Sequence, residues 1–369
     1  MDNTRPTWAE IDLAAIEHNI IQIKKYTDAN IMAVVKANAY GHGIEETLRV
    51  LSETGVTYLG VATLNEALTI REAGFSLPIL VIGHVPEEFA EILIENDIAV
   101  TIYNTTLAPR LSQVALKLRK KATIHIKIDT GMGRLGFAPK SNSIDEIEQI
   151  AKLPGLELEG IFTHFADADN VDKEFAHQQL ACFNYVVSEL GKRGIKFKIK
   201  HTANSAALLT IPEAHFDMVR AGIIIYGLCP AKELNNLNFI PAMRLKSKIS
   251  FVQTVPVQTT IGYGRTYLCE NVTKVATVPI GYADGYSRLL SNKAWAIIKN
   301  QRVNLIGNVC MDQCMFNVSD VENVKIGDEI ILFGRREDGI TADNLADIMG
   351  TINYEVLCSI SARVPRIYI

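Results

Sequence analysis

The sequence predicts an α/β fold with two domains, a (β/α)8 barrel of the TIM type and a C-terminal, mainly β domain. First, short runs rich in Ile and Val alternate with amphipathic stretches through the N-terminal part of the chain, which is typical of a parallel sheet built from β–α units. Second, this alternation then gives way to short apolar runs separated by Gly, Pro and Asp. The length of 369 residues also suits about two domains.

Eight apolar runs are the predicted barrel strands: 31–36, 58–62, 79–82, 99–103, 124–128, 158–163, 197–201 and 216–220. The helical patterns between them, often followed by Gly or Pro, are 45–53, 64–73, 86–95, 107–118, 143–152 and 172–192. Eight strands with helical crossovers in this length fit a closed barrel better than an open sheet.

The predicted strands of the second domain are shorter and follow turn residues, at 245–255, 273–279, 294–299, 302–307, 315–318 and 329–333. The polar segment 231–241, which contains three asparagines, is the expected boundary between the two domains. The predicted domains are therefore 1–235, the barrel, and 236–369, the β domain.

Composition and charge exclude several classes of protein. Hydrophobic residues make up 48% and charged residues 21% of the chain, as in ordinary globular proteins. The net charge of −4 comes without a basic stripe, so nucleic acid is not an expected partner. The first residues lack the apolar core of a signal peptide and no run is long enough for a membrane span, so we expect a cytoplasmic protein with reduced cysteines.

Basic side chains gather where the predicted barrel strands end. Four of these strands have a basic residue at or directly after their carboxyl end, namely Lys36, His164, His201 and Arg220. Arg134 follows the fifth strand. Catalysis in such barrels takes place at the carboxyl ends of the strands. Nearby cations and desolvation lower the pKa of a lysine and make its amine a nucleophile toward an aldehyde, so the pattern predicts a lysine that forms a Schiff base.

The loops after the last two predicted strands contain small residues and a hydroxyl, at 202–207 and 221–224. These are the loops that usually hold a phosphate in this fold, because backbone N–H groups can approach the anion. A phosphate site together with a Schiff-base lysine points to pyridoxal 5′-phosphate as the cofactor.

These residues lie within motifs that resemble the bacterial alanine racemase family along the whole chain. The longest matches are RPTWAEID at 5–12, AVVKANAYGHG at 33–43 and DTGMGRLG at 129–136. Shorter ones are THF at 163–165, ANS at 203–205, VRAG at 219–222, YG at 263–264, GYADGY at 281–286, CMDQ at 310–313 and NYE at 353–355. The resemblance implies a pyridoxal phosphate enzyme that works as a head-to-tail homodimer and interconverts L- and D-alanine.

The resemblance also implies roles for individual residues. Lys36 would carry the cofactor and act as the base on the D-alanine face, and Tyr263 of the partner subunit would act on the L-alanine face. Arg134 and the backbone of Met311 would bind the substrate carboxylate or the cofactor phenolate, and Lys127 matches a lysine that is carbamylated in several relatives. The remaining residues implied to surround the cofactor are Tyr40, His164, Ser205, Arg220, Gly222, Ile223 and Tyr354.

The implied mechanism is a two-base proton transfer, in which the α-proton leaves on one face and returns from either face. A tyrosine serves as a base only if positive groups stabilise its phenolate, and we expect the His164 and Arg220 pair to supply them. His201 is expected to be a structural hydrogen-bond partner. Arg134 and Arg220 could instead pair with Asp129 or Asp217.

Several alternatives remain at this point. GMGRLG at 131–136 fits a dinucleotide fingerprint, but it follows the fifth predicted strand rather than the first. A non-catalytic pyridoxal phosphate-binding protein would lack the β domain, and a decarboxylase of basic amino acids would need a roomier, acidic pocket. Gly262, where the family often has serine, and Asn308 leave open a racemase of another small amino acid such as serine. No metal is expected, because Cys310 and Cys314 lack a second pair of ligands.

Overall fold

The computed structural model describes residues 5–231, 234 and 237–369. The chain forms two compact units. The barrel unit comprises Ile16–Ala39 and the described part of Ile44–Phe239, and the β unit comprises the described residues up to Ala15, Tyr40–Gly43 and Ile240–Ile369. The predicted boundary between residues 235 and 236 lies outside the described residues.

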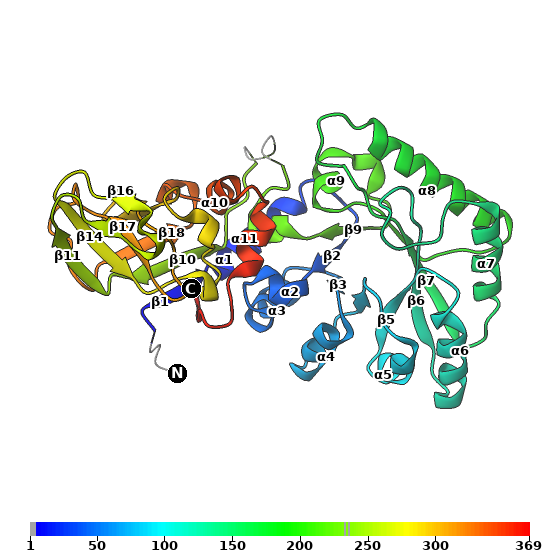
Figure 1. Ribbon diagram of the computed structural model, residues 1–369. Coiled ribbons are helices and arrows are strands. Elements are labelled where there is room, and N and C mark those ends of the chain that lie inside the picture. Colours follow the sequence, from blue (N-terminus) through cyan, green and yellow to red (C-terminus); the bar gives the residue numbers. More distant parts are fainter. Residues whose placement is uncertain (1–4, 232–233, 235–236) are drawn as a thin grey trace. The chain divides into compact units, whose positions relative to one another are not determined.

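The barrel unit confirms the predicted (β/α)8 fold, with eight parallel strands in the order β8-β7-β6-β5-β4-β3-β2-β9 (Figure 1). Its strands are β2 (Asn30–Val34), β3 (Tyr58–Val61), β4 (Ile79–Val81), β5 (Ile98–Ile102), β6 (Ala122–Lys127), β7 (Leu156–Phe162), β8 (Ile199–His201) and β9 (Met218–Ala221). Where β8 meets β9, the Asp217 N–H donates to the Lys200 carbonyl at 3.1 Å. The Asp217 carboxylate accepts from the Lys200 N–H at 2.8 Å.

The helices of the barrel unit lie around this ring of strands (Figure 1). They are α1 (Leu13–Ile23), whose first residues belong to the β unit, and α2 (Lys36–Tyr40), α3 (Ile44–Glu53), α4 (Leu64–Glu72), α5 (Ala90–Glu95), α6 (Leu107–Leu118), α7 (Ser141–Ala151), α8 (Glu174–Lys192) and α9 (Ser205–Thr210). The predicted helix at 86–95 begins as a 3-10 turn, Glu87–Phe89, directly after Pro86. Inside the ring, Met32, Tyr58, Leu80, Phe162 and Met218 pack together, one from each of five strands.

The β unit contains a nine-stranded sheet in the order β11-β14-β17-β16-β15-β18-β10-β1-β19. Its strands are β1 (Thr7–Ile11), β10 (Met243–Lys248), β11 (Phe251–Val255), β14 (Thr273–Val278), β15 (Trp295–Ile298), β16 (Gln301–Leu305), β17 (Cys314–Asn317), β18 (Glu329–Phe333) and β19 (Arg366–Tyr368). Besides a small hairpin, β12 (Thr260–Ile261) and β13 (Tyr267–Leu268), it has two helices, α10 (Ala342–Met349) and α11 (Asn353–Ser359). The predicted strand at 245–255 is two strands, because the chain leaves the sheet at Ile249 and Ser250.

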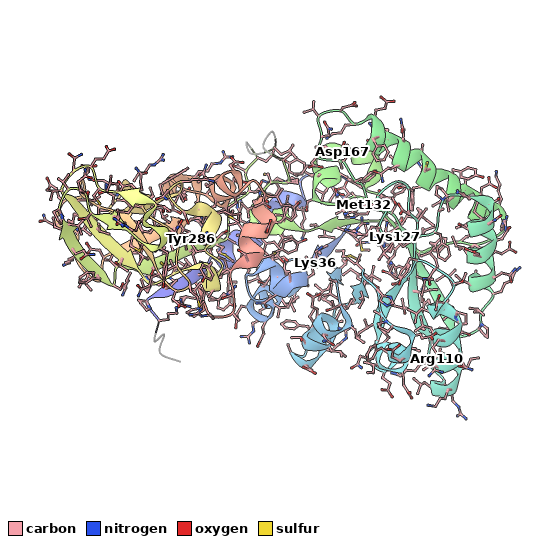
Figure 2. All side chains as sticks on the ribbon, in the orientation of Figure 1. Lys36, Arg110, Lys127, Met132, Asp167 and Tyr286 are labelled. Atoms are coloured by element: carbon pink, nitrogen blue, oxygen red, sulfur yellow. The ribbon has the colours of Figure 1, made fainter. Side chains whose placement is uncertain are left out.

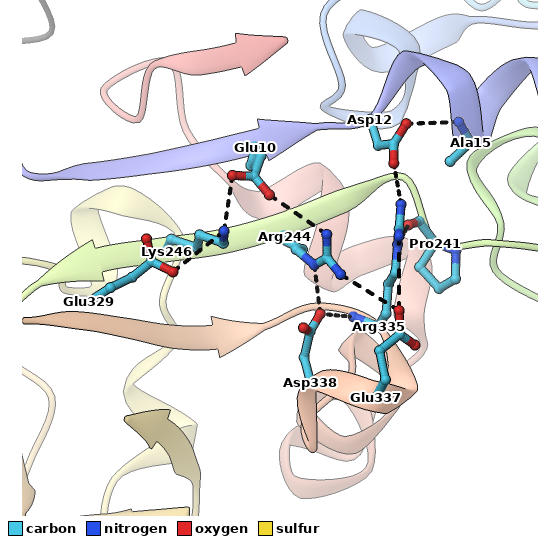
Figure 3. A network of polar contacts seen from close by, with 10 residues as sticks. All are labelled: Glu10, Asp12, Ala15, Pro241, Arg244, Lys246, Glu329, Arg335, Glu337 and Asp338. Atoms are coloured by element: carbon cyan, nitrogen blue, oxygen red, sulfur yellow. Dashed lines mark hydrogen bonds and ion pairs between the residues drawn. The ribbon is translucent and has the colours of Figure 1, made fainter. Parts of the chain in front are cut away.

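The N-terminal strand belongs to the β unit, although the sequence-based division assigned it to the barrel. β1 pairs antiparallel with β10 and parallel with β19. Figure 3 shows the charged side chains that hold β1 to the rest of the β unit. Glu10 accepts a hydrogen bond from Lys246 at 3.0 Å, and Asp12 forms an ion pair with Arg335. These ion pairs join positions more than 230 residues apart in the chain, which a local pattern cannot reveal. Among the described residues, no helix is long and apolar enough to cross a membrane.

Candidate active site

Lys36 lies two residues beyond the end of β2, at the carboxyl end of the barrel strands (Figure 2). The residues after it form a left-handed turn rather than a right-handed helix, since φ is 52° at Ala37, 54° at Asn38 and 55° at Ala39. Each non-glycine residue in this conformation costs roughly 1–2 kcal/mol, with less for Asn. A turn of this kind persists only where its surroundings hold it.

Arg220, on β9, is 3% exposed and surrounded by acceptors from the barrel interior. Its Nη1 lies 3.1 Å from His201 Nδ1 and 2.8 Å from the His201 carbonyl. Its Nη2 donates to the carbonyls of Thr163 and Thr202, each at 2.8 Å, and lies 3.1 Å from His164 Nδ1. None of these acceptors is a carboxylate. Arg220 Nε makes no hydrogen bond to any described residue. Burial and the charge of Arg134 lower the pKa of Arg220 to about 9, so the guanidinium stays positive at neutral pH.

The expected alternative partners of the two arginines are engaged elsewhere. Asp217 pairs with Lys200 at 2.9 Å rather than with Arg220. The Asp129 carboxylate accepts the backbone N–H groups of Gly131 and Gly133, each at 3.0 Å, and so shapes the loop that carries the exposed Arg134. Neither arginine is therefore held by the carboxylates that the sequence suggested.

A chain of hydrogen bonds runs from Arg220 through the barrel interior to Glu159. His201 Nε2 lies 2.9 Å from His125 Nδ1, and His125 Nε2 lies 3.0 Å from Glu159 Oε2, which also accepts from the Tyr58 hydroxyl at 2.8 Å. Burial lowers the pKa of His125 and holds that of His201 well below its ordinary value, so both rings are neutral. Because arginine can only donate, each imidazole accepts at Nδ1 and donates from Nε2. His201 is thus confirmed as a hydrogen-bond partner.

His164 is neutral rather than positive. Burial, with the nearby charges of Arg220, Lys127 and other cations, holds the pKa of its ring well below 6.5. Its Nδ1 accepts from Arg220, which leaves a proton for Nε2. The expectation that His164 and Arg220 both contribute positive charge is therefore wrong for His164, because an imidazolium beside a buried guanidinium is unfavourable.

Lys127 is the last residue of β6 and is 4% exposed (Figure 2). Its Nζ donates to the Ile128 carbonyl at 3.1 Å and lies 5.1 Å from the centre of the Phe162 ring. Burial, together with the charge of Arg220, lowers the pKa of this amine well below its usual range. A deprotonated, buried amine is the form that reacts with carbon dioxide.

Ser205, Gly222 and Ile223 meet at the ends of β8 and β9, as the sequence predicts for a phosphate site. Ser205 is the first residue of α9, where the Asn204 side chain caps the helix by accepting from Ala207 N–H at 3.0 Å. The Gly222 N–H donates to Ser205 Oγ at 2.9 Å, and Ile223 begins a 3-10 turn. Backbone N–H groups and a hydroxyl at such a terminus are the donor set that binds phosphate.

Four of the predicted site residues belong to the β unit. Tyr40 is buried and its ring lies 6.1 Å from that of Tyr354, centroid to centroid. Burial raises the pKa of the Tyr40 phenol far above its usual value. Tyr263 is 74% exposed and Met311 is 53% exposed. The Asn308 amide donates to the Tyr263 carbonyl at 2.7 Å and so fixes the backbone of the exposed tyrosine.

Family models match both parts of the chain. The N-terminal domain of alanine racemase matches residues 11–230, and its C-terminal domain matches residues 242–368. The chain belongs to the alanine racemase family. Because the C-terminal domain is present, the single-domain cofactor-binding protein considered above is the wrong class. The dinucleotide hypothesis also fails, since residues 131–136 follow β6 of a closed barrel.

Individual alanine racemases match nearly the whole chain. That of Clostridium perfringens strain SM101 is 50% identical, with 99% of this chain and 95% of its own length covered. That of Methanococcus maripaludis is 47% identical, with 99% of both chains covered. Two solved structures agree: alanine racemase of Clostridium difficile 630 (TM-score 0.96, 43% identity, coverage 100% and 97%) and that of Bacillus anthracis with bound L-Ala-P (TM-score 0.94, 38%, coverage 100% and 96%). The activity of this alanine racemase family member is the interconversion of L- and D-alanine, an isomerase reaction.

Two carboxylates near the site were not predicted. Glu159 contacts His125, and Glu66 accepts the backbone N–H of Ala37 at 2.7 Å. The pattern Thr63-x-x-Glu66 is a capping-box signature that could have identified the second one as a helix start. No local pattern indicates the first.

Proposed function

We propose that this chain is a pyridoxal 5′-phosphate-dependent alanine racemase that carries the cofactor on Lys36. The observation that supports this most is the arrangement at the carboxyl ends of the barrel strands. Lys36 follows β2, and the side chain of Arg220, which lies on β9, contacts neutral acceptors. The donor groups of Ser205 and Gly222 follow β8 and β9. β2 and β9 are neighbours in the barrel, so the lysine and the arginine stand on adjacent strands.

The chain's own groups fit the cofactor. Ser205, Gly222 and Ile223 would donate to the phosphate, and Tyr40 and Tyr354 would add contacts to it. Arg220 has one N–H without a partner among the described residues, on Nε, and we propose that this group donates to the ring nitrogen. When bound, pyridoxal phosphate stabilises the negative charge left on the substrate α-carbon after the proton leaves.

Two bases on opposite faces of the substrate would move the proton. Lys36 takes or returns it on the D-alanine face, and Tyr263 of the partner subunit does so on the L-alanine face. The high exposure of Tyr263 in the single chain supports a role at a subunit interface. With His164 neutral, the positive charge that would stabilise a phenolate there comes from Arg220.

Arg134 and the backbone of Met311 would bind the substrate carboxylate or the cofactor phenolate. Carbamylation of Lys127 would turn a neutral amine into an anion, and this anion could pair with Arg134 and hold the exposed loop in place. We propose that the enzyme works in the cytoplasm as a head-to-tail homodimer and supplies D-alanine for peptidoglycan.

The first test combines a spectrum with an activity assay. The absorbance spectrum before and after borohydride and the conversion of L-alanine to D-alanine are measured for wild type, Lys36→Ala and Tyr263→Phe. We expect a visible band that borohydride removes, its loss in Lys36→Ala, and a selective loss of the L-face step in Tyr263→Phe. Binding of the cofactor without turnover would contradict the proposal, and a kcat/KM for serine above that for alanine would contradict the substrate.

A further inference from the structure

Glu66 lies on the first turn of α4. Its two carboxylate oxygens accept hydrogen bonds from two different segments of the chain. Oε2 accepts from Thr63 N–H at 3.1 Å, as part of a helix capping box, and also from Ala62 N–H at 2.7 Å. Oε1 faces away from its own helix and accepts from Ala37 N–H at 2.7 Å. The residue that directly follows Lys36 is therefore tied to the start of α4.

This bond acts on the left-handed turn described above. Within the turn, Ala39 N–H donates to the Val35 carbonyl at 2.9 Å, and Asn38 Oδ1 accepts from Ile44 N–H at 2.9 Å. Both bonds lie within residues 35–44, so they stabilise the turn without fixing it to the rest of the barrel. Glu66 supplies an attachment from another β–α unit.

The barrel places Glu66 beside Lys36 for a simple reason. β2 and β3 are adjacent, with Val34 opposite Gly60, and Val35 N–H continues the ladder to the Gly60 carbonyl at 2.9 Å. Both strands end at the same edge, so the start of α4 and the residues after β2 meet there. The contact between Glu66 and Ala37 therefore lies directly after Lys36 in the chain.

We propose that Glu66 is a positioning residue for Lys36: its carboxylate holds the strained turn in register, so that the amine reaches the same place in every catalytic cycle. This rests on the proposed role of Lys36. Displacing a reacting group by about 1 Å can cost on the order of 100-fold in rate. Substrate binding depends on Arg134 and Met311, so the loss should fall on kcat rather than on KM.

Thr63→Ala is the matched control. The Thr63 hydroxyl accepts from Glu66 N–H at 3.3 Å in the same capping box, but it makes no bond to the turn. Glu66→Ala and Thr63→Ala therefore both weaken the start of α4, and only Glu66→Ala releases Ala37. Glu66→Gln keeps one oxygen acceptor but presents an NH2 group to one of the two N–H sets, so its effect should be intermediate.

Two readouts test the proposal. In the apo protein, amide hydrogen exchange of a peptide spanning residues 36–44 should become about tenfold faster in Glu66→Ala and stay as in wild type in Thr63→Ala. In the loaded enzyme, kcat for alanine should fall about tenfold or more in Glu66→Ala at nearly constant KM, with less than a threefold change in Thr63→Ala. Equal effects of the two variants, or unchanged exchange in Glu66→Ala, would overturn the proposal. Failure of Lys36→Ala to alter the cofactor spectrum would instead overturn the role of Lys36 and leave the exchange result standing.

Discussion

Three histidines of the barrel unit, the buried His125 and His201 and the half-buried His164, should make the stability of the enzyme fall steeply as the pH drops below 7. Burial is the first cause that lowers the pKa of each ring from the ordinary 6.5. In the unfolded chain the same rings take up protons near pH 6.5. The folded state therefore keeps its full stability above that pH and loses it as the pH falls toward the lowered pKa values.

The size of the effect follows from the linkage relation. One pH unit below 6.5, each ring that stays neutral in the fold costs about 1.4 kcal/mol relative to the unfolded chain. His164 and His201, whose pKa values lie well below 6.5, should together cost about 3 kcal/mol between pH 7.5 and pH 5.5, and His125, whose pKa is also lowered, adds to this loss. The carboxylates of Glu159 and Asp129 have lowered pKa values and titrate below this window. Lys127, whose pKa burial also lowers, is present in every protein tested, so the test compares variants.

The assay is urea unfolding at pH 5.5, 6.5 and 7.5 for wild type, His201→Asn and the control His84→Gln, which changes an exposed ring. His201→Asn should be less stable at every pH, because Arg220 loses an acceptor. Its stability should nevertheless fall by about 1.4 kcal/mol less than that of wild type between pH 7.5 and 5.5. If His201→Asn keeps the wild-type slope, His201 is not a neutral ring in the fold and the hydrogen-bond directions derived above are wrong.

Four further changes have expected outcomes. Native mass spectrometry in bicarbonate should show one added carbon dioxide that is absent in Lys127→Met, since burial lowers the pKa of the Lys127 amine and so favours its neutral, reactive form. Ser205→Ala should raise the Kd for pyridoxal phosphate about tenfold in an absorbance titration, because a hydrogen bond to a charged group is lost. Gly285→Ala should lower Tm sharply, since φ is +98° and a Cβ would lie 2.2 Å from a backbone oxygen, whereas Gly350→Ala, with φ of +73° and open space, should cost much less. Arg220→Glu should raise transamination relative to racemisation, and an unchanged product ratio would contradict the role of Arg220.

The barrel could be predicted because most of its strands are short runs rich in apolar residues that alternate with helical patterns. All eight predicted runs overlap β2 to β9, and the predicted helix at 107–118 coincides with α6. β1 was not predicted, since its five residues are stabilised by β10 and β19, which lie far away in sequence. α10 and α11 were missed in the same way, because the sequence reading expected only strands in the β domain.

The same difference between local patterns and long-range contacts applies to the candidate site. The places of Lys36 and Arg220 could be predicted because both lie within two residues of the carboxyl end of a strand, and the position of a residue near a strand end is a local property. The partners of Arg220 could not be predicted, since they lie at the end of β8 and directly after β7 and β8, and so depend on which strands are neighbours. The contact of Glu66 with Ala37 required the adjacency of β2 and β3 as well as the capping box.

The contacts of Arg220 explain how a buried guanidinium can remain charged while its Nε–H group is left for a further hydrogen bond. Its Nη atoms are held by three carbonyls and two neutral imidazoles, which fix the plane of the group without cancelling its charge. A carboxylate in direct contact would have raised its stability as a cation and weakened its field at the proposed cofactor site. The nearest negative end of the hydrogen-bond chain is Glu159, two imidazoles away, and its charge polarises His125 and His201 toward Arg220. The barrel thus keeps the full positive charge of Arg220 at its mouth and leaves Nε–H for a neutral acceptor.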